Sequence, residues 1–279
     1  MSFGLPPDTA EGKLTYGGYL KVEELTSLQT LLSDPPQHDE LLFIIIHQVY
    51  ELWFKELLHE VDTIIDELNR DRLLGAHRLL RRCIEIERVL VNQIAVLETI
   101  TPHDFLEFRD NLMPASGFQS WQFRELEVVS GLKEYGYLKH YPEGSAAYVK
   151  LKRRLESPSL RDAFYSMLRR RQSGFPDEEA GSREARIVEL ARILRDPEAH
   201  YDLFLLTESL IEYDEIFSLW RLRHVKMVER MIGRKTGTGG SQGAAYLWTT
   251  TGKTFFPELW EVRTRLSNKA GEADDVKDR

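Results

Sequence analysis

The sequence predicts an all-α fold whose core is a bundle of long antiparallel helices, with few or no strands. Apolar residues recur at spacings of three and four through most of the chain, which is the period of an amphipathic helix. No segment alternates apolar and polar residues as a half-buried strand would, and no internal repeat divides the chain. We therefore expect residues 1–266 to form a single helical domain.

The first half of the chain contains the clearest helical patterns. Residues 39–69 include neither Pro nor Gly and would extend over about 45 Å at 1.5 Å per residue. Residues 71–99 predict a second long helix. Before these two, the apolar spacing predicts a helix over 19–33 that a following DPP sequence ends. After them, Thr101 as N-cap and a proline in the first turn predict a short helix over 101–110.

The second half alternates shorter helices with breaks rich in Gly, Pro and Ser. In chain order we expect a loop at 113–123 that enters another helix, a connection at 135–145, shorter helices within 146–195 broken at 157–159 and 172–184, a long helix at 197–232, a glycine-rich loop at 233–243 and a last helix at 255–266. Residues 267–279 are polar and are expected to form a disordered tail.

The composition argues against several classes of protein. Lys and Arg total 37 against 45 Asp and Glu, so the net charge is −8, which disfavours binding to nucleic acid or to an anionic membrane surface. The one cysteine, Cys83, allows no intrachain disulfide and no multi-cysteine metal site. The N-terminus lacks the pattern of a signal peptide, and no window is apolar enough to span a membrane. We expect a cytoplasmic protein.

Two histidines lie within apolar helical stretches, where each needs a partner. On a helix, His47 shares its face with Phe43, Tyr50 and Phe54. By itself, this pattern is accounted for by a core histidine that is bonded to a backbone or side-chain group.

His224 lies on a second apolar face, together with Trp220 and Val228, and cationic side chains flank it. A b-type haem requires this combination, because an imidazole ligates the iron, apolar residues cover the porphyrin and arginines can meet the propionates. Spacing argues against a di-iron site, since the Glu-x-x-His at 56–59 has no second copy on another helix. The remaining histidines carry no ligand-like spacing and are interpreted as surface or capping residues: His38, His59, His77, His103, His140 and His200.

Two further segments could bind a small anion. The loop at 237–243, GTGGSQG, fits neither the Walker A pattern nor the dinucleotide fingerprint. Its glycines would expose backbone N–H groups beside the hydroxyl of Thr238, although a flexible linker would have the same composition.

Arg109, on an apolar side of its short helix, could bind a carboxylate through two hydrogen bonds or could be a surface residue. Ser116 follows in a loop that could line the same cavity.

Five separated motifs, taken together and in order, resemble the tryptophan 2,3-dioxygenase family of the bacterial type. They are LTYGGYL at 14–20, HDELLFIIIHQVYELWFKELLHE at 38–60, FRDNLMPASGFQSWQFRELE at 108–127, LWRLRHVKMVERMIG at 219–233 and GTGGSQG at 237–243. The similarity covers residues 14–265 and is weakest over 130–200. Two positions depart from the usual family pattern: Gln242 replaces a serine, and Val49 replaces a common threonine.

The resemblance implies a haem b-dependent homotetramer, a dimer of dimers, that acts on L-tryptophan and O₂. Such an enzyme cleaves the indole C2–C3 bond to give N-formylkynurenine, the first step of tryptophan degradation by the kynurenine pathway. By this similarity His224 is the proximal ligand of the haem iron. His47 is the catalytic distal histidine, which meets the indole N–H and does not bind iron.

The resemblance also implies which residues bind the substrate. Phe43 packs on the indole, Arg109 pairs with the carboxylate, and Thr238 contacts the carboxylate and ammonium end. Phe105 holds a place that is Tyr or Phe in the family, and Ser116 borders haem and substrate. The N-terminal segment, residues 14–33, would reach into the pocket of a neighbouring subunit through Tyr16, Tyr19 and Leu20.

Two alternatives remain open on the sequence. One is a related haem dioxygenase that acts on a modified indole or on another aromatic amino acid. The other is a non-catalytic haem sensor or helical interaction protein, in which His47, His224 and Arg109 would be core and surface residues. The colour of the purified protein and its product from L-tryptophan would distinguish them.

Overall fold

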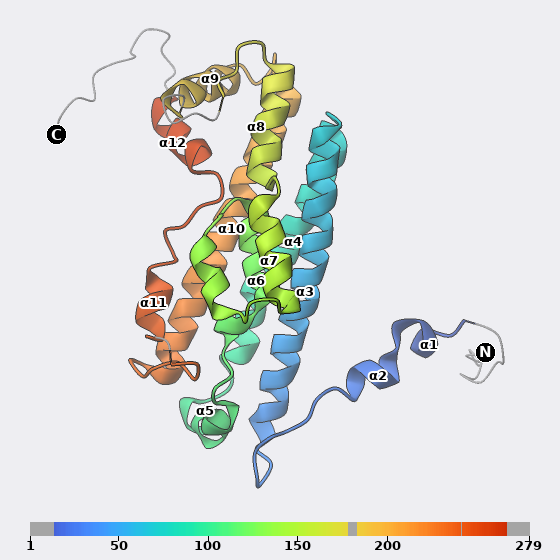
Figure 1. Ribbon diagram of the computed structural model, residues 1–279, viewed down its shortest axis with the longest axis vertical. Helices are drawn as coiled ribbons and strands as arrows, with labels where there is room; N and C mark the ends of the chain where they lie inside the picture. Colours follow the sequence, from blue (N-terminus) through green and yellow to red (C-terminus); the bar gives the residue numbers. More distant parts are fainter. Residues whose placement is uncertain (1–13, 178–182, 241, 267–279) are drawn as a thin grey trace, which may run out of the picture.

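The core of the fold is a set of three long helices. The computed structural model describes residues 14–177, 183–240 and 242–266, and within these ranges the regular structure is helical, without strands. Figure 1 shows α3 (His38–Asn69), α4 (Leu73–Leu97) and α10 (Tyr201–Ile232) side by side, with α4 packed between the other two. The predicted all-α bundle is confirmed.

Shorter helices cover this core and close its two ends. They are α5 (Pro102–Arg109), α6 (Trp121–Ser130), α7 (Ala146–Glu156), α8 (Leu160–Arg171), α9 (Arg183–Arg195), α11 (Ala244–Trp248) and α12 (Pro257–Arg265). Both α6 and α8 pack on α3, and α11 packs on α10. Near one end of the bundle lies α5, while α9 and α12 pair at the opposite end (Figure 1). Three short 3-10 segments, Asp110–Leu112, Gly117–Gln119 and Tyr135–His140, lie in the connections around α5 and α6.

Local sequence signals explain where these helices begin. The Thr101 hydroxyl accepts a hydrogen bond from the Asp104 N–H at 3.2 Å, and Pro102 fills the first position of α5, as predicted. At α8, Ser159 and Asp162 form a reciprocal capping box. These caps satisfy N–H groups that the helix itself leaves free.

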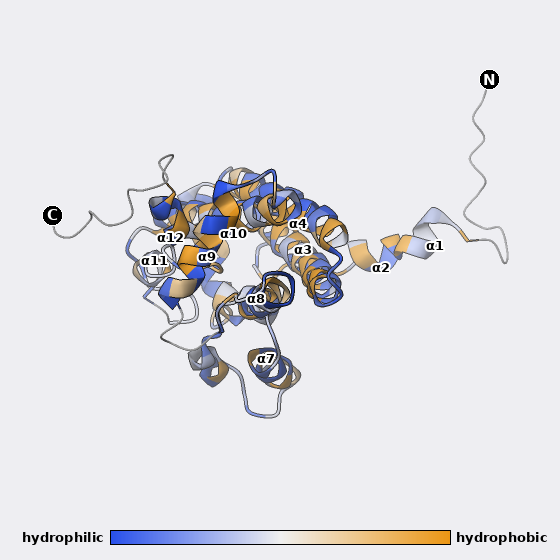
Figure 2. Cartoon of the chain, turned by 90° about the horizontal axis from the view of Figure 1, so that it is seen from above, coloured by the Kyte–Doolittle hydropathy of each residue, from blue (hydrophilic) through white to orange (hydrophobic). Residues whose placement is uncertain are grey.

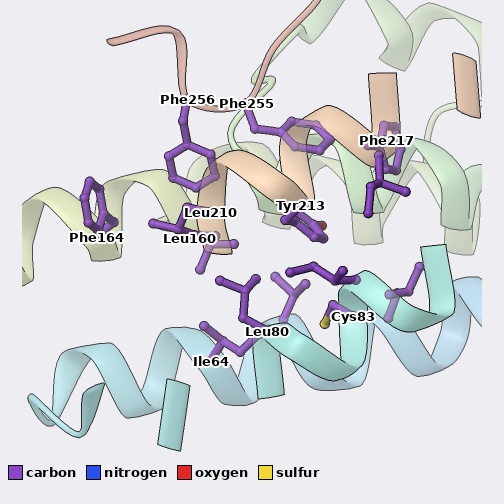
Figure 3. Close-up of a cluster of buried hydrophobic side chains, with 14 of the residues drawn as sticks. Ile64, Leu80, Cys83, Leu160, Phe164, Leu210, Tyr213, Phe217, Phe255 and Phe256 are labelled. Atoms are coloured by element: carbon purple, nitrogen blue, oxygen red, sulfur yellow. The ribbon is translucent and has the colours of Figure 1, made fainter. Parts of the chain in front are cut away.

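Aliphatic and aromatic side chains fill the space between the long helices (Figure 3). Ile64 of α3, Leu80 of α4 and Leu210 of α10 are fully buried there, next to Phe255 and Phe256 from the segment before α12. Each such side chain stabilises the fold by about 1.5–3 kcal/mol. The buried Tyr213 satisfies its hydroxyl with the Ser130 hydroxyl at 2.7 Å.

The predicted helix over 19–33 is wrong in its second half. The structure has two short helices, α1 (Tyr16–Leu20) and α2 (Val22–Thr26), separated by Lys21 in the left-handed region at φ 54°. Residues 27–33 are not helical, and the N–H groups of Leu32 and Ser33 bind the Glu40 carboxylate at 2.7 and 3.0 Å. An apolar period stabilises a helix only when that face is buried, and here it is not.

We call residues 14–33 the N-terminal arm, and its two short helices project away from the bundle. Figures 1 and 2 show α1 and α2 standing clear of the other helices. Leu14, Tyr16 and Tyr19 are 82%, 79% and 71% exposed. Large apolar side chains at such exposure would be stabilised by a partner surface.

The remaining boundaries agree with the sequence to within four residues, apart from α11, which was not predicted because five residues carry too little periodicity. Residues 267–279, predicted to be a disordered tail, lie outside the described residues. In the described part of the chain, no helix combines the length and the apolar character needed to cross a bilayer.

Candidate functional site

One cavity, at the α5 end of the bundle, brings together most of the residues singled out in the sequence. Its lining comes mainly from α3, α4, α5, α6, α10, α11 and the two loops at 113–120 and 233–243. Nine of the predicted residues line it: Phe43, His47, Phe105, Arg109, Ser116, Trp220, His224, Val228 and Thr238.

His47 faces this cavity from α3 in a defined tautomer. Its Nδ1–H donates to the backbone carbonyl of Phe43, one helical turn earlier, at 2.7 Å. In the neutral ring this bond leaves Nε2 as an acceptor. Burial among apolar groups lowers the pKa of His47, while the Phe43 carbonyl and the nearby Glu51 partly oppose that shift. A neutral imidazole with a free acceptor therefore faces the cavity.

His224 faces the cavity from α10. Its ring is stacked on Trp220, with centroids 5.1 Å apart and planes 6° apart. Burial lowers the pKa of His224 to about 4, and the charges of His47 and Arg124 act in the same direction. Within the described residues, no hydrogen bond engages its ring. A neutral imidazole that is held in place by stacking is able to donate a nitrogen lone pair to a metal.

Aromatic rings form the wall beside His47. The ring of Phe43 lies 4.1 Å from His47, 5.7 Å from Phe105 and 5.6 Å from Phe108, measured between centroids. Phe105 and Phe108 meet edge to face at 90°. Such a wall offers a flat, apolar surface to a planar aromatic ligand.

Polar groups gather where the glycine-rich loop meets this wall. The Arg109 guanidinium donates to the Thr236 carbonyl, and the Thr238 hydroxyl donates to the Ala115 carbonyl at 2.6 Å. A Cβ at Gly239 would lie only 2.7 Å from the Cβ of Ser116, so glycine is needed there for the loop to approach closely. Arg109, Ser116 and Thr238 thus lie together, although Thr238 comes 122 positions after Ser116 in the chain.

A buried charge cluster that the sequence did not reveal lines another part of the cavity. Glu127 of α6 accepts a hydrogen bond from Arg124 at 2.7 Å and one from Arg221 of α10 at 3.0 Å. All three are at most 5% exposed. The spacing of Arg124 and Glu127 suits a helical ion pair, but such pairs are usually at the surface, so no sequence pattern indicated that this one is buried.

The cations flanking His224 do not all face the cavity. Only Arg221 lines it, whereas Arg223 binds Glu98 at 2.7 Å and Lys226 binds Glu229 at 3.1 Å on the outside of α10.

The six other histidines do not line the cavity, and His59 is exposed on α3. No cluster of three or more His, Cys, Asp or Glu side chains that could hold a metal ion occurs in the described ranges.

The predicted residues of the N-terminal arm lie apart from the cavity. Tyr16, Tyr19 and Leu20 are on α1 and are not among the residues that line it. None of the three is buried, with Leu20 43% exposed. The site predicted from the sequence is therefore assembled within one chain except for these three side chains.

Comparison with known proteins gives a consistent set of relatives. The family model described as tryptophan 2,3-dioxygenase matches residues 6–175 and 182–266. A tryptophan 2,3-dioxygenase of Nocardioides sp. is 50% identical over 260 residues, 91% of this chain and 95% of the relative. Proteins of the same name from Myxococcus xanthus and Herpetosiphon aurantiacus are 43% and 45% identical, over 95% and 91% of this chain and 93% and 98% of the relatives.

Proposed function

Because the chain belongs to the tryptophan 2,3-dioxygenase family, we propose that it cleaves the indole C2–C3 bond of L-tryptophan with O₂. The product is N-formylkynurenine, and the reaction is the first step of tryptophan degradation by the kynurenine pathway. One observation carries the proposal: two neutral histidines on different helices face one cavity, which has an aromatic wall and an arginine.

The residues around His224 fit a b-type haem. Its imidazole is neutral, it has no competing hydrogen bond within the described residues, and Trp220 and Val228 offer apolar cover beside it. Arg124 and Arg221 share the single carboxylate of Glu127, so this wall has one positive charge in excess for a propionate. In this proposal His224 is the proximal ligand, and the bound haem iron supplies the oxygen chemistry.

His47 would receive the indole N–H. The free Nε2 of His47 is a hydrogen-bond acceptor, because Nδ1–H is already committed to the Phe43 carbonyl. Phe43 and Phe105 would pack on the faces and edges of the ring. We assign His47 the orientation of the indole rather than removal of its proton, since indole N–H is a very weak acid. A histidine in an apolar run then has its partner supplied by the substrate.

The amino-acid end of L-tryptophan would bind at the glycine-rich loop. Arg109 suits the carboxylate, since a guanidinium presents two parallel N–H groups. Thr238 would contact the carboxylate and ammonium end, and Ser116 would border both haem and substrate. Arg109 and Thr238 now bind the backbone carbonyls of Thr236 and Ala115, so substrate binding must exchange these bonds. Closing the loop on the substrate would also keep water away from the reaction.

The N-terminal arm suggests how subunits would assemble. Its exposed Tyr16, Tyr19 and Leu20 would be buried by a second copy of the chain, next to that copy's cavity. We propose a homotetramer, a dimer of dimers, in which residues 1–266 form one domain and the arm completes a neighbouring site. A cytoplasmic location is proposed from the single cysteine, Cys83, which is free and buried.

The test is a spectrum followed by a reaction. Purified protein should show a Soret band, and the ferrous protein should convert L-tryptophan and O₂ to N-formylkynurenine, identified by mass. A protein that remains colourless after haemin is added, or that binds haemin but leaves L-tryptophan and its analogues unchanged, would refute the proposal.

A further inference from the structure

Glu87 is a buried carboxyl group that the proposed reaction does not use. It lies on α4, facing α10, and is 1% exposed. Within the described residues, neither of its carboxyl oxygens has a hydrogen-bond partner. Other buried carboxylates of this core differ: Glu127 binds two arginines, and Asp214 accepts hydrogen bonds from the N–H groups of Phe255, Phe256 and Trp260.

This environment favours the neutral acid at position 87. An ionised carboxylate that is buried without donors is strongly destabilised, and it takes up a proton instead. Burial raises the pKa of Glu87 well above its ordinary value, the charge of Asp214 raises it further, and Arg221 partly opposes both. The charge of Glu87 would also act on Cys83 of the same helix and on Tyr213 of α10, and the charge of Glu60 on α3 acts on Cys83 as well.

Arg221 connects this region to the cavity. One terminal nitrogen of its guanidinium donates to the Lys253 carbonyl at 2.7 Å, and the other donates to Glu127 at 3.0 Å. Its Nε is buried and has no hydrogen-bond partner within the described residues. Arg221 thus has a guanidinium nitrogen, Nε, without a hydrogen-bond partner in the described part of the chain, while the charge of Glu87 would act on it from α4.

We propose that Glu87 is a positioning residue for the cavity, acting through Arg221. As a neutral acid it leaves Arg221 bound to Glu127 and to the Lys253 carbonyl. After losing its proton it would be a second buried carboxylate that competes for the Arg221 guanidinium. Arg221 would then be drawn from the cavity wall, and the Arg124–Glu127 pair would lose its partner. The claim that this wall serves catalysis rests on the proposed function, whereas the neutral state of Glu87 does not.

The first test is infrared spectroscopy of the protein as isolated, comparing wild type with Glu87→Gln. The matched control is Glu60→Gln, because Glu60 is also buried, 3% exposed, but is ion-paired with Arg82 of α4. At neutral pH we expect the carbonyl stretch of a protonated carboxylic acid, lost in Glu87→Gln and retained in Glu60→Gln. Absence of the band at neutral pH, or its persistence in Glu87→Gln, would overturn the proposal.

The second test is the pH profile of kcat/KM for L-tryptophan. Above the pH midpoint at which the infrared band disappears, kcat/KM of wild type and of Glu60→Gln should fall about tenfold per pH unit. The kcat/KM of Glu87→Gln should not fall in this way. A structural role alone would leave the profiles parallel, and parallel profiles would overturn the positioning role. An inactive wild type would refute the proposed function instead, and the infrared comparison would still report on Glu87.

Discussion

Replacing Arg109 by alanine tests the proposed carboxylate site most quantitatively. Arg109 is largely buried, with a side chain 13% exposed, so its hydrogen bonds are only weakly screened by solvent. Two charge-assisted bonds to a substrate carboxylate would contribute about 3–6 kcal/mol, from about 1.5–3 kcal/mol each. Binding also breaks the existing bond from Arg109 to the Thr236 carbonyl, which offsets about 1.5–3 kcal/mol. The net loss in Arg109→Ala is then about 1.5–3 kcal/mol, or roughly tenfold to a hundredfold in affinity.

The assay compares the dissociation constants of L-tryptophan and tryptamine, which lacks the carboxylate, by spectral titration. Arg109→Ala should weaken the binding of L-tryptophan about tenfold to a hundredfold and that of tryptamine by less than about threefold. Arg171→Ala serves as the control, because Arg171 pairs with Asp202 at the surface and is not part of the cavity lining. Equal losses for the two ligands would show that Arg109 does not bind the carboxylate.

Three further substitutions test other parts of the site and core. His47→Ala should lower kcat/KM about tenfold to a hundredfold while haem is retained, since one hydrogen bond to the indole would be lost. Loss of the Soret band would contradict the assignment of His47 to the substrate rather than to the haem iron. Gly239→Ala should weaken the binding of L-tryptophan about tenfold, because its Cβ would clash with Ser116. Gly252→Ala should leave binding unchanged, because there is open space around Gly252. Equal effects of the two substitutions would refute the need for a close approach at Gly239. In wild type, the free energy of unfolding should fall as pH rises, because folded Glu87 keeps a proton that the unfolded chain releases above its ordinary pKa. Glu87→Gln should make this fall smaller. Denaturant titrations that give the same dependence of unfolding free energy on pH for both proteins would contradict this.

The long helices could be predicted because periodicity and burial agree there. Residues 38–69 and 201–232 carry an apolar stripe that the bundle buries, so the sequence pattern and the tertiary structure favour the same conformation. The N-terminal arm shows the opposite case. Its apolar spacing resembles that of a helix up to Ser33, but the bundle leaves the side chains of Leu25, Leu28 and Leu32 exposed, and the helix ends at Thr26.

The site was predictable where a residue type is unusual for its surroundings. The histidines at positions 47 and 224 stand out within apolar stripes, and the resemblance to a family singled out Arg109, Ser116 and Thr238. All five residues line the cavity. Arg124, Glu127 and Glu87 were missed because their charged side chains suggest a solvated helix face. Only the packing of α4 and α6 against the rest of the bundle shows that these groups are buried.

Haemin binding by wild type and His224→Ala, followed in the Soret region, tests the proposed iron ligand directly. Far-ultraviolet circular dichroism would confirm that both proteins are folded. We expect one haem per wild-type chain and a variant that keeps its helical spectrum but no longer retains haem. A folded His224→Ala protein that binds haem with the wild-type spectrum and affinity would contradict the central claim that this imidazole is the iron ligand.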